Sequence, residues 1–160
     1  MENKILEQIK NSEADMLGTL EKLVNIDSGY DAIEGTAEIA HIVGDFLTPY
    51  GFEVQYLETP NAPTHVLAKR PRPGKKKVML MGHMDTVFAK GTAAARPFKV
   101  ADGKAYGPGV MDMKAGIVLS LYTVKALLDN GWDDTDLTLF FCGDEELAHP
   151  LTDAVEWFKK

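Results

Sequence analysis

Three short segments of the sequence carry side chains that could together hold a divalent cation and activate a water molecule. They supply one histidine and four carboxylates, which are His83, Asp85, Asp112, Glu145 and Glu146. Imidazole and carboxylate groups are ligands of zinc, which lowers the pKa of a bound water molecule to about 7. A carboxylate beside that water can then accept its proton. The residue types therefore predict a metal site that activates water for hydrolysis.

The first segment places His83 directly after the apolar run 78–81, which is predicted to be a strand. A side chain in this position points into the crevice beyond the carboxyl end of a sheet, where α/β folds bind their ligands. Asp85 could accept a hydrogen bond from the second ring nitrogen and so fix the tautomer of a metal-binding imidazole. A structural histidine at the end of a strand is the alternative interpretation, and the pair alone does not choose between them.

The second segment brings the chain through Gly107-Pro108-Gly109 to Asp112, near the predicted start of a helix. A carboxylate at this point commonly caps the helix. It could equally bridge two cations about 3.5–4 Å apart. Both interpretations stay open for Asp112.

The third segment follows the apolar run 137–142 and holds three consecutive acidic residues at 144–146. Carboxylates at the end of a buried strand are costly to desolvate unless a positive charge neutralises them. Adjacent side chains point in different directions, so one of Glu145 and Glu146 could bind a metal ion while the other acts as a general base. A solvated acidic turn is the alternative.

The remaining histidines and the single cysteine are weaker candidates. We interpret His41, in a predicted helix, and His65, at the start of a predicted strand, as surface or core residues. His149 follows the glutamate pair and stays open as a ligand. Cys142 lies inside an apolar strand, which predicts a buried, inert thiol.

Hydrophobic periodicity predicts the elements that must position these side chains. Helices are expected over 5–23, 33–47, 112–128 and 153–160, and strands over 52–57, 64–69, 77–81 and 137–142. A turn without strands is expected at 101–103. This order of elements predicts an α/β fold, an α/β/α sandwich around a mixed sheet.

Composition excludes several classes of protein. The chain has 160 residues, 45% of them hydrophobic and 26% charged, which suits one globular domain. A net charge of −7 argues against a nucleic-acid partner, because a phosphate backbone attracts basic surfaces. One cysteine allows no internal disulfide, and no apolar stretch reaches the length of a signal core or a membrane span. We therefore expect a cytoplasmic protein without membrane contacts.

Taken together, the three segments resemble the M20 family of metallopeptidases, most closely its glutamate carboxypeptidase branch. They read Met-Gly-His-Met-Asp-Thr-Val at 81–87, Gly-Pro-Gly-Val-Met-Asp-Met-Lys-Ala-Gly at 107–116 and Asp-Glu-Glu at 144–146. The resemblance runs from the first predicted helix to about Glu146. It implies a zinc-peptidase catalytic domain with two zinc ions, in which cobalt or manganese would also suit the mixed nitrogen and oxygen ligands.

The resemblance also implies a role for each residue of the site. His83 would bind one zinc ion, Asp112 would bridge both ions and Glu146 would bind the other. Glu145 would be the general base, and Asp85 would orient His83. The implied reaction is the hydrolysis of an amide bond in a peptide or an N-acyl amino acid. The peptide bond between Asp112 and Met113 is expected to be cis.

Members of the family are longer than this sequence. They contain an inserted domain for dimerisation and substrate binding, and they return to the catalytic domain afterwards, adding further metal ligands. Residues 1–160 are therefore expected to be a truncated catalytic domain that lacks both parts and has little activity alone. A homo-oligomer or a complementing chain could supply the rest, and uncovered apolar surface would favour association. A dipeptidase or deacylase of the same family, and a non-catalytic binding or regulatory domain that retains the fold, are the alternatives.

Overall fold

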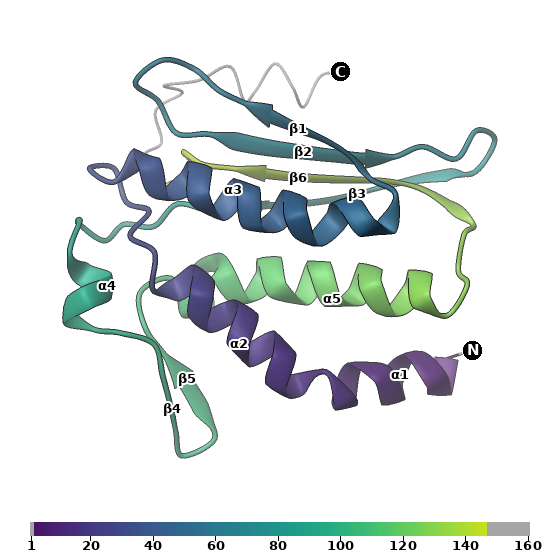
Figure 1. Cartoon of the computed structure of the whole chain (residues 1–160), viewed down its shortest axis with the longest axis horizontal. Coiled ribbons are helices and arrows are strands. Elements are labelled where there is room, and N and C mark those ends of the chain that lie inside the picture. Colours follow the sequence, from purple (N-terminus) through teal and green to yellow (C-terminus); the bar gives the residue numbers. More distant parts are fainter. Residues whose placement is uncertain (1, 147–160) are drawn as a thin grey trace.

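A four-stranded mixed sheet forms the centre of the fold, with the strand order β1-β2-β6-β3 (Figure 1). The structure is a computed structural model and describes residues 2–146. The strands are β1 (Glu53–Leu57), β2 (His65–Arg70), β3 (Lys76–His83) and β6 (Thr135–Cys142). Strands β1 and β2, and also β2 and β6, are antiparallel, whereas β3 runs parallel to β6. The predicted mixed sheet is therefore confirmed.

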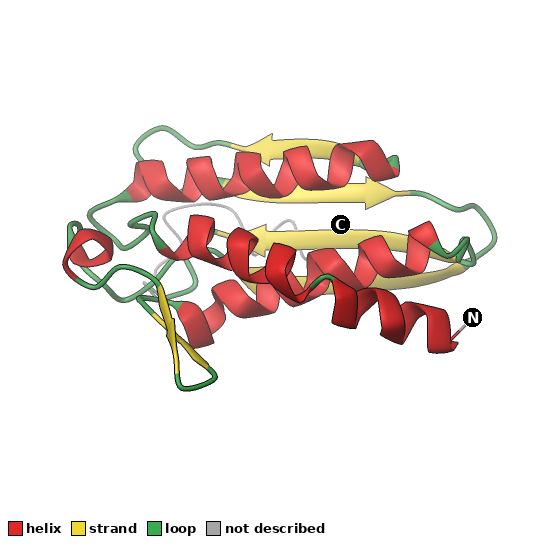
Figure 2. Ribbon diagram, turned by 60° about the horizontal axis from the view of Figure 1, so that its bottom comes forward, coloured by secondary structure: helices red, strands yellow, loops and turns green. Residues whose placement is uncertain are grey.

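Helices cover one face of this sheet (Figures 1 and 2). The helices next to the sheet are α3 (Ile33–Leu47) and α5 (Ala115–Asp129). On the same side, α1 (Glu2–Asn11) and α2 (Glu13–Val24) pack against α5. The short helix α4 (Thr92–Ala95) lies at one end of the molecule. The predicted α/β class is confirmed, and the helix expected over 153–160 lies outside the described residues. Within 2–146 the structure contains no helix with the length and apolar character needed to cross a membrane.

The first helical segment is divided at Ser12, where a single helix was expected. Ser12 has φ −91° and ψ 4°, outside the regular helical geometry. Its hydroxyl donates a hydrogen bond to the backbone oxygen of Gln8 at 2.9 Å. Serine commonly competes with regular helix geometry in this way, which is why the apolar periodicity alone did not predict the break.

The core lies between the sheet and the helices and follows the alternation of side chains along the strands. Leu137, Leu139 and Phe141 of β6 face the helices and pack in the main core, whereas Phe140 and Cys142 point to the other face. Burial of each large apolar side chain contributes about 1.5–3 kcal/mol to folding. This packing fixes β6 and therefore the position of the acidic residues that follow it.

The parallel pairing of β3 with β6 places the first and third segments of the sequence at the same edge of the sheet. His83, the last residue of β3, pairs with Cys142, the last residue of β6. The chain leaves both strands at this edge. The loops that begin at Met84 and at Gly143 are therefore neighbours.

A small hairpin projects from the end of the molecule that carries α4 (Figure 1). Its strands are β4 (Lys99–Ala101) and β5 (Lys104–Tyr106), joined by Asp102 and Gly103 with φ of 51° and 70°. Two successive residues with positive φ are typical of the tight turns that connect hairpin strands. The turn was predicted, but the strands were not, because each has only three residues and is largely exposed.

Candidate metal centre

His83 stands at the centre of the candidate site, buried at the end of β3. Its Nδ1 atom lies 3.2 Å from the backbone oxygen of Asp85 and 3.3 Å from the carboxylate of the same residue. Its Nε2 atom lies 3.1 Å from the carboxylate of Asp112 and 3.9 Å from that of Glu145. One ring nitrogen is thus held by the residue expected to orient it, and the other faces acidic groups from two other segments.

Asp85 does more than contact the ring of His83. Its buried carboxylate accepts hydrogen bonds from the backbone N–H groups of Glu145 at 3.2 Å and Glu146 at 2.8 Å. Charge-assisted bonds of this kind are about twice as strong as neutral ones. Asp85 therefore joins the loop after β3 to the loop after β6. Nothing in the sequence indicated this contact, because its donors are backbone groups.

Asp112 lies in the irregular turn η2 (Val110–Lys114), where its φ of −127° and ψ of 101° are not helical. The peptide bond from Asp112 to Met113 is cis, as expected. The expected helix start at Asp112 is wrong, since α5 begins three residues later at Ala115 with Lys114 at its N-cap. The Asp112 carboxylate consequently contacts His83 and does not cap a helix, while its side chain stays 76% exposed.

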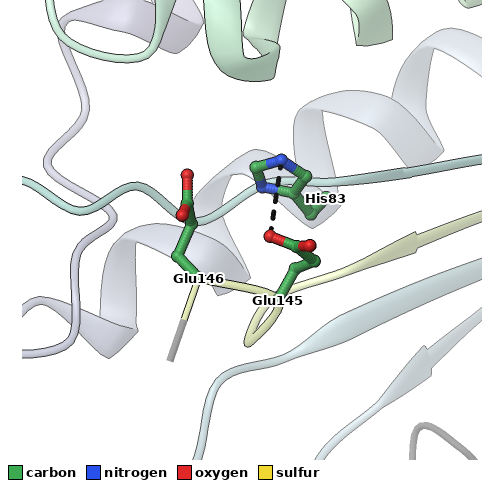
Figure 3. Close-up of side chains that lie close together, drawn as sticks. All are labelled: His83, Glu145 and Glu146. Carbon is green, nitrogen blue, oxygen red and sulfur yellow. Dashed lines mark ion pairs between the residues drawn. The ribbon is translucent and has the colours of Figure 1, made fainter. Parts of the chain in front are cut away.

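The glutamates approach His83 from the end of β6 (Figure 3). One ligand atom from each of His83, Glu145 and Glu146 lies within 4.8 Å of the other two. Asp112 is not in this group, although it and Glu146 line the same cavity of about 300 Å³. Ligands of one tetrahedral zinc ion lie about 3.3 Å apart, so small side-chain movements would bring these donors to bonding distance. One nitrogen and several carboxylate oxygens form a donor set that fits zinc.

The protonation of the site reflects its surplus of acidic groups. Burial of the His83 ring lowers its pKa, but hydrogen bonds to Asp85 and Asp112 and the charge of Glu145 outweigh burial and raise the pKa to about 9. Burial also raises the pKa of Glu146, and the nearby Asp112 and Glu145 add to this effect against the opposing influence of His83. The raised pKa of His83 thus follows from negative charge that a bound cation would neutralise, whereas the raised pKa of Glu146 follows first from burial.

The residues that flank Asp112 fasten its turn to the rest of the fold. Met113 accepts a hydrogen bond through its sulfur from the backbone N–H of His83 at 3.3 Å. The Lys114 side chain, which is only 1% exposed, donates to the backbone oxygens of Leu23 at 2.9 Å and Ile26 at 2.8 Å. Burial lowers the pKa of Lys114 to about 8. Sequence reasoning missed both residues, because their partners are a backbone amide and two backbone carbonyls.

We expect Asp85→Asn to weaken the site and the fold together. The amide would present one N–H₂ donor to groups that are themselves N–H donors, so a buried bond to Glu145 or Glu146 would be lost. The free energy of unfolding should fall by about 1–3 kcal/mol. Zinc affinity should fall about 10–100-fold, as it does when a residue that orients a ligand is changed. Urea unfolding and a zinc titration measure the two effects.

Asp45→Asn, at an exposed position on α3, is the matched control and should change neither quantity. A folded Asp85→Asn variant with unchanged zinc affinity would show that Asp85 does not support the site.

The remaining histidines and the cysteine that the structure describes pack or form hydrogen bonds within the fold. His41 is exposed on α3 and contacts Tyr56, with ring centroids 4.1 Å apart and ring planes tilted by 46°. His65 is buried in β2, and its Nδ1 accepts the backbone N–H of Gly143 at 2.9 Å. Cys142 is buried as predicted, and burial raises its thiol pKa to about 12. His149 lies outside the described residues.

Comparisons with known proteins agree with this geometry. Residues 79–158 match the model of peptidase family M20/M25/M40. Carboxypeptidase G2 from a Pseudomonas strain is 36% identical over 148 residues, which are 91% of this chain and 36% of that protein. Succinyl-diaminopimelate desuccinylase from Corynebacterium glutamicum is 40% identical over 87 residues, which are 54% of this chain and 23% of that protein.

Among solved structures, human carnosine dipeptidase 1 is similar with a TM-score of 0.84 at 22% identity. The match covers 99% of this chain and 38% of that one, so it shows the fold. The chain thus corresponds to about a third of the length of the first relative that it matches. The alignment to a carboxypeptidase and the shared fold agree with the family model, and the match of that model to half of the chain establishes that this chain belongs to peptidase family M20/M25/M40.

Proposed function

We propose that this chain provides the metal-binding part of a hydrolase that cleaves amide bonds in peptides or N-acyl amino acids. The observation that carries the proposal is the convergence of His83, Glu145 and Glu146 within 4.8 Å, with the Asp112 carboxylate 3.1 Å from Nε2 of His83. Membership of the peptidase family and similarity to a carboxypeptidase and a desuccinylase support the same class of reaction.

His83, Asp112 and Glu146 would be the residues of this chain that hold the zinc ions. When bound, the ions would polarise the scissile carbonyl and lower the pKa of a water molecule. Glu145 would take the proton from that water and return it to the leaving amine. Its side chain is 59% exposed and its Oε2 atom lies 3.9 Å from His83, so it can reach a substrate from the open side. Asp85 would keep Nδ1 protonated and Nε2 directed at the metal.

The matched part of this chain covers 36% of carboxypeptidase G2. In keeping with this share, we propose that a complete site contains metal ligands in addition to those of residues 1–160. We therefore expect residues 1–160 alone to bind zinc weakly and to hydrolyse little. A second copy or a complementing chain would supply the missing groups. Carboxypeptidase activity is the prediction for the complete enzyme, with dipeptidase or deacylase activity as the alternatives. The cytoplasmic location is a separate prediction.

Zinc content tests this proposal without requiring turnover. Glu146→Ala should reduce the zinc retained in equilibrium dialysis by at least about tenfold, because it removes a carboxylate ligand. Glu145→Gln should retain zinc, because the general base is not required for binding. Metal analysis of the dialysed protein measures both, and Glu21→Ala at an exposed position on α2 is the control.

Unchanged zinc content in Glu146→Ala would contradict the proposal. It would favour the alternative, in which the domain retains the fold as a non-catalytic binding or regulatory part.

A further inference from the structure

A second, larger cavity adjoins the candidate metal centre. It has a volume of about 620 Å³ and is lined by the segment after α4, by the β4–β5 hairpin and by the turn that leads to Asp112. It shares Gly107, Val110 and Met111 with the smaller cavity that Asp112 and Glu146 line. Met111 is 92% exposed and forms part of both walls. A molecule bound at the metal centre could therefore extend into the larger cavity.

The charge of this cavity is opposite to that of the chain. Its lining includes Arg96 and Lys99 and no acidic residue, although the chain carries a net charge of −7. Within residues 2–146 neither side chain forms an ion pair, unlike Arg70, Lys75 and Lys90. Two basic side chains that line one cavity and lack an acidic partner there favour an anionic ligand.

An aromatic ring lies against each of the two basic groups. The guanidinium carbon of Arg96 lies 4.7 Å from the centroid of the Phe88 ring, and the Lys99 ammonium lies 5.4 Å from that of Tyr106. Contacts of this kind contribute about 0.5–1 kcal/mol at exposed sites and restrict the position of the charge. Phe88 also lines the smaller cavity. The Arg96 charge is thus held over a ring that forms part of the wall of the metal centre.

We propose that Arg96 and Lys99 form a subsite for a carboxylate of the substrate, separate from the amide bond that is cleaved. This inference rests on the proposed function and narrows its substrate class to N-acyl amino acids or dipeptides that carry an additional carboxylate. Guanidinium suits this ligand because its planar donors match the two oxygens of a carboxylate. Val110 and Met111 supply apolar wall for the methylene groups between the carboxylate and the amide.

The additional carboxylate could belong to the acyl group or to the side chain of the amino acid, and matched ligands separate these sources. N-succinylglycine and N-butyrylglycine differ only in the carboxylate at the end of the acyl chain. N-acetylglutamate and N-acetylnorvaline differ in the same way at the end of the amino-acid side chain. The dissociation constants of all four are measured by NMR titration of the zinc-loaded chain and of the metal-free chain.

The carboxylate-bearing member of at least one pair should bind about tenfold more tightly than its neutral counterpart. Arg96→Gln and Lys99→Gln should each reduce this preference to about threefold or less, and Arg96→Lys should retain more of it than Arg96→Gln. Lys104→Gln removes a charge from the same hairpin outside the cavity lining and should leave the preference unchanged. All variants should retain their far-ultraviolet circular dichroism, since the changed side chains are exposed.

Equal affinities within both pairs, or a preference that survives in both Gln variants, would overturn the subsite. Zinc content is measured on the same samples, so failure of the metal centre is recognised separately. If the chain retains no zinc, the preference of the metal-free chain decides the subsite alone. If zinc binds and the preference is absent, the subsite is wrong and the proposed function stands.

Discussion

Replacing His83 with alanine should lower the zinc affinity of this chain by more than about 100-fold. Loss of a residue that only orients a ligand costs about 10–100-fold, and His83 is expected to be a ligand itself. It is also the nitrogen donor in the group formed with Glu145 and Glu146, and nitrogen favours zinc over magnesium. Competition with a chromophoric chelator measures the affinity.

His41→Ala is the matched control for this experiment, because it removes an exposed histidine from α3 and should not change zinc binding. His83→Asn provides a second test, since its amide can still bond to neighbouring groups if the alanine variant folds poorly. A folded variant of either kind with the zinc affinity of the parent chain would show that His83 is not a ligand.

Replacing Gly29 with alanine should lower the free energy of unfolding by about 3 kcal/mol or more. The added methyl group would lie 1.8 Å from the backbone oxygen of Phe88 and 3.3 Å from that of Thr86. These neighbours are backbone atoms and cannot rotate away, so the cost should reach or exceed the upper end of the range of about 1–3 kcal/mol that is typical of overpacking. The same loop is held by Ser28, whose hydroxyl donates to the Met84 oxygen at 2.9 Å. Urea unfolding measures the change.

Gly18→Ala is the control for this prediction. Gly18 lies in the interior of α2, and no atom lies within 4 Å of the position that a methyl group would take. Alanine should therefore leave stability unchanged or raise it by up to about 1 kcal/mol. Equal losses in the two variants would show that the close approach of Gly29 to Phe88 has no role in stability.

The sequence predicted most reliably the elements that have clear periodicity and clear ends. The helix expected over 33–47 agrees with α3 (Ile33–Leu47), because Pro49 and Gly51 end a regular apolar pattern. The apolar runs before His83 and Asp144 correctly indicated strands, although β3 and β6 extend beyond the predicted limits. Strand order and direction were not predictable in the same way, because they depend on contacts between segments far apart in the chain.

The site was predictable in its residue types and only partly in its arrangement. Since His83 and the glutamates each follow a strand, their meeting at one edge could be expected. The place of Asp112 in the site and the cis bond after it were expected from the family resemblance and not from periodicity, which wrongly started a helix at Asp112, where the structure has an irregular turn. The anchoring of that turn by Lys114 was also hidden, since burial of a lysine against backbone carbonyls leaves no pattern in the sequence.

The pairing of His83 with Cys142 across parallel strands has a consequence for how this protein tolerates change. The spacing between the imidazole and the glutamates is determined by the backbone ladder, and each residue of a strand adds about 3.3 Å. Inserting or deleting one residue in β3 would displace the imidazole by this length and turn it to the opposite face of the sheet. Substitutions at outward-facing positions such as Met79 and Met81 leave the ladder intact. Redesign of β3 is therefore free in side-chain chemistry at these outward-facing positions only, and it is constrained in strand length throughout.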